Sequence, residues 1–347
     1  MVSKRRLILE LASVFVFFLL LVYSPALTST PSPTPSFKPI SLKVVSTAGP
    51  TYSSRVMLEK AMKLIEERAG GRIKFEYYAG DTLIKHSEAF PSMKDNIVQM
   101  GMVSTGYEAD RMGIAAITTY APFCYDIEEF SKHWRDPGGL YDFWAPYYEK
   151  VGLKLLSFPC AGGTQINFRT SVKTLKDFKG KLVRCPAGIH TEIVKLWGAQ
   201  PVFIDNPEVY IALSKGTVDG SLGASLDSTI SLKQYEVAPY FTILDINQGV
   251  IQQAINLKVY NSLPSDLQKL IMDTFLELER EHYTNIGNKI KTDLENLKTK
   301  PGVQIYVPTK EEKAEWIGGI GPLYKKWEST YGAAWQKFWE IQKHLHK

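Results

Sequence analysis

Sequence signatures of catalysis are scarce in this chain of 347 residues. It contains no G-x-S-x-G nucleophile motif, no H-E-x-x-H zinc motif and no P-loop. It has six histidines, and only His344 and His346, near the end of the sequence, have a metal-like spacing. These absences favour a binding protein over an enzyme, and they give no reason to expect a cofactor or a metal ion.

Cysteine is also rare, with three residues at Cys124, Cys160 and Cys185. Because this number is odd, at least one thiol is expected to be free. Cys160 and Cys185 each follow an expected strand, so a bridge between them and two buried free thiols both remain open. No cysteine comes directly after the apolar N-terminal run, which argues against a lipid-modified N-terminus.

Neither basic nor acidic residues are in large excess. The formal net charge is +5, and Lys and Arg mostly alternate with Asp and Glu along the chain. Nucleic-acid-binding proteins concentrate basic residues in a patch or a stripe, so we expect no nucleic-acid partner. The hydrophobic content of 44% is ordinary for a soluble globular protein, and the length allows two domains.

The N-terminal segment differs from the rest of the chain. Basic residues at 4–6 precede the apolar run Leu11–Tyr23, and Ser24 and Ala26 fit a cleavage site. We interpret residues 1–26 as a signal peptide, with a retained membrane anchor as the alternative, and expect the protein in the periplasm or extracytoplasmic space. Residues 27–37 are rich in Pro, Ser and Thr and are typical of a linker, so the folded part should begin near Lys38.

Strand and helix patterns alternate after this linker. Alternation of apolar residues predicts strands at 40–46, 72–80, 99–105, 151–159, 181–183, 199–205 and 217–222. Helical periodicity and cap residues predict helices at 53–69, 86–98, 190–197 and 207–216, the last capped by Asn206. This order predicts an α/β fold with parallel or mixed sheets covered by helices.

The pattern changes at Ser265. Residues 265–298 contain no proline and keep a helical repeat of apolar residues, which predicts one very long helix or two helices in line. The mean helix has about 11 residues, so a helix of this length should extend over more than one domain. Four tryptophans follow in helical stretches, and we expect them to pack in the core: Trp316, Trp327, Trp335 and Trp339.

Arg184 is the first candidate for a binding residue. It follows a short expected strand and precedes a Pro–Ala–Gly turn. In open α/β sheets ligands bind beyond the carboxyl ends of the strands. A guanidinium at that place can bind a carboxylate by donating two parallel hydrogen bonds to it. A surface salt bridge is the alternative role for this arginine.

Four segments, in this order, resemble a known family. They are "ERAGGRIKFEYYAGDTL" at 67–83, "TLKDFKGKLVRCP" at 174–186, "WGAQPVFIDNPEVYIALSKGTVDG" at 197–220 and "LPSDLQKLI" at 263–271. The chain is similar to the solute-binding proteins of TRAP (tripartite ATP-independent periplasmic) transporters, of the dicarboxylate type called DctP. The resemblance covers roughly residues 40 to 340.

The resemblance implies a two-lobed periplasmic-binding-protein fold of type II, with a hinge and a long domain-spanning helix. Lobe I would comprise residues 38–161 and 249–288, and lobe II residues 162–248 and 289–340. Two such lobes would close on a ligand held in the cleft between them.

The resemblance also implies the site residues. Arg184 matches the arginine that clamps the substrate carboxylate. After Asp219 and Gly220 many family members carry a Glu that touches substrate, whereas this chain continues with Ser-Leu-Gly-Ala. We expect this change to leave room for an acid bulkier or more apolar than the usual dicarboxylates. The further candidates for contacts with the ligand are Gln165, Asn167, Arg169, Thr105, Tyr107, Ser221 and Gly223.

The resemblance implies a function without catalysis. The protein would capture an organic acid anion outside the cytoplasm and deliver it to the integral membrane subunits of a TRAP-type secondary transporter. A homodimer is possible, because the tryptophan-rich tail is compatible with one. The alternatives are a binding protein of another importer, such as an ATP-driven one, a binding protein of a sensor system, and an exported hydrolase.

Overall fold

The computed structural model describes residues 38–104, 107–115, 127–186, 188–245 and 248–345. From Pro39 onward these residues form one compact unit. The expected signal peptide or anchor and the linker, at residues 1–37, lie outside the described residues, as does Cys124. Within the described part of the chain, no helix combines the length and the apolar character that crossing a membrane requires.

The first sheet is mixed and has the strand order β2-β1-β3-β11-β4. Strand β1 (Ile40–Ser46) pairs in parallel with β2 (Ile73–Ala79) and β3 (Met100–Val103), as the sequence predicts. Strand β11 (Gln252–Asn256) is antiparallel to β3 and to β4 (Leu153–Ser157). We call the part of the chain built on this sheet lobe I.

The second sheet has the order β12-β9-β5-β8-β6-β7, and β10 (Gln248–Val250) also pairs with β5. All nine residues of β5 (Cys160–Phe168) are buried, and sequence patterns did not predict this strand. Strand β6 (Leu182–Cys185) is parallel to β7 (Gln200–Phe203) and β8 (Gly220–Ser225). Strand β12 (Gln304–Tyr306) pairs with β9 (Tyr240–Thr242). We call this part lobe II.

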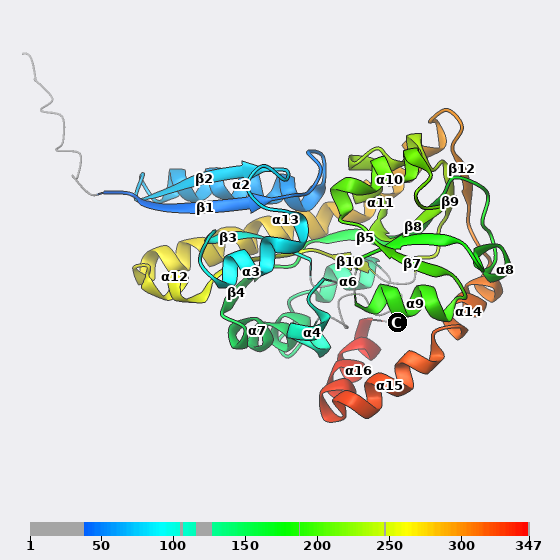
Figure 1. Cartoon of the computed structure of the whole chain (residues 1–347). Helices are drawn as coiled ribbons and strands as arrows, with labels where there is room; N and C mark the ends of the chain where they lie inside the picture. Colours follow the sequence, from blue (N-terminus) through cyan, green and yellow to red (C-terminus); the bar gives the residue numbers. More distant parts are fainter. Residues whose placement is uncertain (1–37, 105–106, 116–126, 187, 246–247, 346–347) are drawn as a thin grey trace, which may run out of the picture. The chain divides into compact units, whose positions relative to one another are not determined.

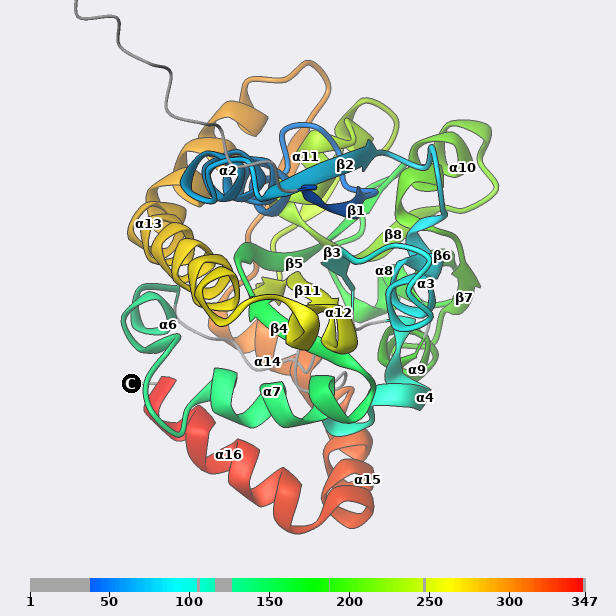
Figure 2. The same ribbon diagram turned by 90° about the vertical axis from the view of Figure 1, so that its left-hand side faces the viewer.

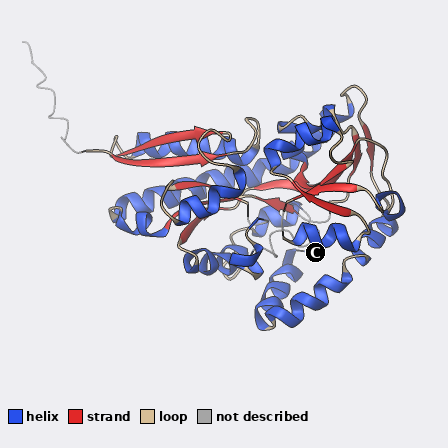
Figure 3. Ribbon diagram, viewed as in Figure 1, coloured by secondary structure: helices blue, strands red, loops and turns tan. Residues whose placement is uncertain are grey.

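Helices flank the strands of both sheets (Figure 3). In lobe I these are α2 (Ser53–Arg68), η1 (His86–Glu88), α3 (Ala89–Lys94), α4 (Ala109–Met112), α6 (Ile127–His133), α7 (Leu140–Lys150) and α12 (Leu257–Ser262). In lobe II they are α8 (Leu175–Phe178), α9 (Ile189–Leu196), η3 (Asn206–Glu208), α10 (Val209–Lys215), α11 (Leu226–Ser231) and η4 (Gln234–Glu236). The helix predicted at 86–98 is therefore shorter than expected.

The strands of each sheet fall almost entirely within the segments expected for the two lobes. Two short crossings join the sheets, one between β4 and β5 and one between β10 and β11. They lie side by side, because the Ile251 amide donates to the Pro159 carbonyl at 3.1 Å. The exact division of the chain between the lobes stays a prediction.

The long helix is confirmed as a single helix, α13 (Ser265–Lys298), of 34 residues. It contacts α2 and β4 of lobe I as well as α11 and β5 of lobe II (Figure 1). Beyond it the chain forms α14 (Lys310–Gly318), α15 (Gly321–Tyr331) and α16 (Ala333–Leu345). Helix α16 returns to lobe I and lies next to α7 (Figure 2). The ring centroids of Phe338 in α16 and Phe143 in α7 are 5.6 Å apart.

Core packing is confirmed for three of the four tryptophans of the tail, because Trp316, Trp327 and Trp335 are buried. Trp339 is 42% exposed. The two cysteines in the described part, Cys160 and Cys185, are buried and are not bridged to each other. Burial raises the pKa of Cys160 to about 12 and also raises the pKa of Cys185, so both thiols stay protonated.

A buried ion pair fixes α13 to the crossing between the lobes. Glu279 is fully buried and accepts hydrogen bonds from the Phe158 amide at 2.6 Å and from Arg135 Nη2 at 2.9 Å. Arg135 also donates to the Leu156 carbonyl at 2.8 Å. Burial raises the pKa of Glu279 to about 7, against the opposite effect of Arg135. The charges of Glu279 and Arg135 therefore stabilise each other in the interior, where either one alone would be costly to bury.

We predict that Glu279→Ala destabilises the protein by roughly 3–5 kcal/mol, because it leaves the Arg135 charge and the Phe158 amide without their acceptor. Denaturant unfolding of the two proteins measures this difference. The matched control is Glu281→Ala, two residues along the same helix. Its side chain is 54% exposed and pairs with Lys60, so a change within about 0.5 kcal/mol is expected. Equal losses for both variants would contradict the role given to Glu279.

Candidate functional site

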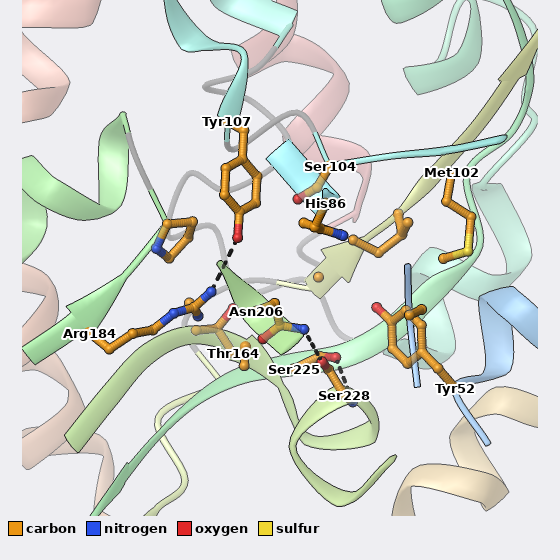
Figure 4. A pocket seen from close by; sticks show the side chains of 16 residues that line it. Tyr52, His86, Met102, Ser104, Tyr107, Thr164, Arg184, Asn206, Ser225 and Ser228 are labelled. Atoms are coloured by element: carbon orange, nitrogen blue, oxygen red, sulfur yellow. Dashed lines mark hydrogen bonds between the residues drawn. The ribbon is translucent and has the colours of Figure 1, made fainter. Parts of the chain in front are cut away.

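A pocket lies between the two lobes (Figure 4). It holds a cavity of about 40 Å³. Lobe I contributes Ala48, Tyr52, His86, Met102, Ser104 and Tyr107 to the lining, and the crossing contributes Ile251. Lobe II contributes Thr164, Arg184, Pro186, Asn206, Gly223, Ala224, Ser225, Ser228 and Gly249. Both lobes are therefore needed to form this pocket.

Arg184 is the charged residue of this pocket and is only 1% exposed. Its strand, β6, places it in the sheet beside Val202 of β7 and Ser221 of β8. Nε donates to the Ile204 carbonyl at 2.9 Å, and Nη2 donates to the Tyr107 hydroxyl of lobe I at 3.2 Å. Nη1 is buried and has no hydrogen-bond partner among the described residues. A buried cation with an unused donor is a suitable site for a carboxylate.

Two histidines close to Arg184 are neutral. Burial lowers the pKa of His86 to about 4, and the Arg184 charge adds to this effect while Asp205 opposes it. The hydroxyl of Thr47 is hydrogen-bonded to Nδ1 of His86. Burial lowers the pKa of His190 to about 3, again with a contribution from Arg184. Around neutral pH these imidazoles therefore add no positive charge to the site.

The structure brings three of the residues named from the sequence to the pocket wall: Arg184, Tyr107 and Gly223. Three others are buried in the sheet next to it, namely Gln165, Asn167 and Ser221. Gln165 donates to Asp245 at 2.7 Å, while Asn167 and Ser221 face each other across β5 and β8, in the row that continues to Arg184. These three support the wall and are not part of the lining.

One further sequence candidate, Arg169, does not line the described pocket. It is exposed at the far end of β5, and its guanidinium lies over Gly216, where an added Cβ would come within 2.6 Å of Nη1. Another candidate, Thr105, lies outside the described residues.

The expectation of extra room after Asp219 and Gly220 stays a prediction, because it concerns the position of Ser221. Strand β8 begins at Gly220, so Ser221 and Gly223 lie inside the strand and do not follow its end. Gly223 has a φ of +92°, and a Cβ there would meet Pro186 at 2.6 Å and His190 at 3.0 Å. At Gly223 itself the pocket wall is therefore closely packed.

Asn206 and His86 line the pocket but were not identified from the sequence. Asn206 was expected to cap a helix, yet its Nδ2 instead donates to Ser228 Oγ at 2.9 Å. Its Oδ1 is buried without a partner among the described residues. His86 is brought to the site from 98 residues before Arg184 in the sequence by the pairing of the two lobes. Neither residue belongs to a local motif that would have identified it.

Direct hydrogen bonds join the lobes beside the pocket. Asp227 of lobe II accepts from the backbone amide of Ser53 at 2.8 Å and from its hydroxyl at 2.5 Å, at the first residue of α2. The other oxygen of Asp227 accepts from Lys289 at 2.9 Å. Ser87 of lobe I donates to Asp205 of lobe II at 2.8 Å. The described conformation is thus one in which the lobes are held together.

Comparison with known proteins agrees with this architecture. The family model for bacterial extracellular solute-binding proteins of family 7, DctP, matches residues 44–330. The C4-dicarboxylate-binding protein DctB of Bacillus subtilis is 25% identical over 280 residues, which are 79% of this chain and 78% of DctB. A monocarboxylate 2-oxoacid-binding periplasmic protein of a Nostoc species is 22% identical over 279 residues, with coverages of 79% and 75%.

A solved structure confirms the fold. DctP7 of Bordetella pertussis, an extracytoplasmic solute receptor binding pyroglutamic acid, matches with a TM-score of 0.80 at 17% sequence identity, over 88% of this chain and 99% of that chain. The two-lobed α/β fold expected from the sequence is therefore confirmed. Because the family model covers most of its length, the chain belongs to the DctP family of bacterial extracellular solute-binding proteins.

Proposed function

We propose that this protein captures an organic acid anion outside the cytoplasm and delivers it to the membrane subunits of a TRAP-type secondary transporter. The observation that carries the proposal is the buried guanidinium of Arg184 in the pocket between the lobes, with Nη1 unpaired among the described residues. A carboxylate that accepts from Nη1 would supply the missing partner. The names of the relatives, which refer to C4-dicarboxylates, 2-oxoacids and pyroglutamic acid, support an organic acid as the ligand.

Ligand binding and lobe closure are coupled in this proposal. Arg184 belongs to lobe II and Tyr107, which accepts from it, belongs to lobe I. A carboxylate held by Arg184 in this pocket would have groups of both lobes around it. The ligand would therefore bind the closed conformation better than the open one and shift the population toward it. The membrane subunits could then distinguish the loaded protein by its shape.

The remaining features of the proposal come from the sequence. Residues 1–26 would direct export, or remain as an anchor, and the linker at 27–37 would separate the folded part from the membrane. The lobes would follow the division 38–161 with 249–288 and 162–248 with 289–340. A homodimer remains a prediction.

The alternative functions are less well supported. An interrupted helix after residue 265 would have favoured the binding protein of another importer, whereas α13 runs without a break to Lys298. An exported hydrolase would need an activated nucleophile, and the two described thiols are buried and protonated. A sensor role would use the same pocket and differs only in the membrane partner.

Removing the guanidinium tests the proposed function directly. Arg184→Ala should weaken the binding of any organic acid found in a thermal-shift screen by roughly 2–5 kcal/mol, because the carboxylate loses its charged partner. Isothermal titration calorimetry measures the loss. Arg169→Ala is the matched control, since Arg169 is exposed and away from the pocket, and it should bind as the wild type does. If Arg184→Ala binds with unchanged affinity, the role of Arg184 is wrong.

Asp227 should control the closed conformation. We predict that Asp227→Asn weakens ligand affinity by about ten- to a hundredfold, because charged hydrogen bonds to Ser53 and Lys289 hold the lobes together. Small-angle X-ray scattering should show a larger radius of gyration for the variant without ligand. Asp293→Asn is the control, because Asp293 pairs with the same Lys289 from within α13. A change of similar size in both variants would contradict the role of Asp227.

A further inference from the structure

We propose that the pocket selects short acids with a single negative charge and an uncharged tail, and discriminates against dicarboxylates. This inference deepens the proposed function and rests on it. The relatives do not decide the point, because one is named for dicarboxylates and another for monocarboxylates.

The count of charges is the first argument. Of the 16 described residues that line the pocket, Arg184 alone carries a full charge. One carboxylate neutralises one guanidinium. A second carboxylate in the same enclosed space would lose its water without gaining a cation, which costs several kcal/mol.

His86 does not supply a second cation. The groups that face His86 are Thr47, Tyr107, Asp205 and Arg184. Burial and the Arg184 charge outweigh Asp205 and keep the imidazole neutral, with a pKa of about 4. Asp205 is itself buried and close enough to His86 to influence it. Its negative charge disfavours a second anionic group nearby.

The wall away from Arg184 is suited to an uncharged tail. In Figure 4 Tyr52 and Met102 lie on the opposite side of the pocket from Arg184. Ala48 and Ile251 add apolar surface to the lining. The cavity of about 40 Å³ is small. The ligand should therefore be short.

One unused acceptor guides the choice of probes. Asn206 lines the pocket, and its Oδ1 is buried without a partner among the described residues. A hydroxyl group on the ligand could donate to it, whereas a second carboxylate could not. Hydroxy acids are therefore included in the panel.

The test compares pairs of acids in which a methyl group of one member is replaced by a carboxylate in the other. The pairs are butanoate and succinate, 2-hydroxybutanoate and malate, and 2-oxopentanoate and 2-oxoglutarate. With the full folded protein in calorimetry at about neutral pH, the singly charged member of a pair should bind at least about tenfold tighter. A dicarboxylate that binds as tightly as its partner, or tighter, overturns this inference and leaves the proposed function intact. If no member of the panel binds, the inference fails, and the proposed function fails too if a wider acid screen also gives no ligand.

A variant with a second cation tests the cause of the selectivity. Ser104 lines the pocket from lobe I, directly after β3. Ser104→Lys should improve the affinity for the dicarboxylate relative to its partner by about tenfold or more, and the uncharged Ser104→Met, of similar length, should not. If the folded Lys variant shows no gain in affinity for the dicarboxylate relative to its partner, the selectivity is not caused by the presence of a single cation. Should that variant not fold, the panel on the wild-type protein decides.

The charge state of His86 provides an independent measurement. The affinity for a singly charged acid that binds should be the same at about pH 5.5 and about pH 8, because His86 stays neutral over this range. A rise of several-fold toward the lower pH would mean that a second cation forms in the site. That result would overturn the count of charges on which the inference depends.

Discussion

The burial of one permanent positive charge is the constraint on which this structure depends. Arg184 cannot lose its proton, and within the protein it is held by a backbone carbonyl and a phenol, neither of which is charged. A cation in this position is costly unless an anion joins it. The fold tolerates the cost in a pocket that two lobes enclose together. We therefore propose that Arg184 is one half of an ion pair whose other half is the ligand.

The contacts between the lobes follow the same principle. The first amide of α2, that of Ser53, has no acceptor within its own helix. In the structure a carboxylate from the other lobe, Asp227, accepts from both the amide and the hydroxyl of Ser53. Opening the lobes would expose these groups to water, which can replace the bonds at modest net cost. Several hydrogen bonds, each of small net free energy, thus favour the closed conformation. A ligand bound to Arg184 can then shift the equilibrium between the open and closed conformations.

The parts of the fold that sequence patterns predicted are those governed by local rules. Strand β1 alternates buried and exposed residues in its first half, and α13 keeps its helical repeat for 34 residues. Strand β5 was missed because its sequence has two adjacent glycines followed by polar Thr, Gln and Asn, yet all of it is buried between neighbouring strands. Arg184 was found because it stands in a recognisable segment. His86 and Asp227 were not, because their partners lie far away in the sequence and only the folded chain brings them together.

The glycine in β8 shows why a missing side chain does not predict an empty space. Gly223 lies two residues after Ser221, the position where many family members carry a Glu. The backbone at Gly223 lies against Pro186 and His190, both in the segment that follows Arg184. The conformation with positive φ permits this close approach, which a side chain would prevent. Neighbouring rings therefore occupy the space beside this glycine, and the wall is closely packed there. The choice among acids must then come from the charges and donors that remain, and in this pocket these are one guanidinium, neutral imidazole, hydroxyls and an amide.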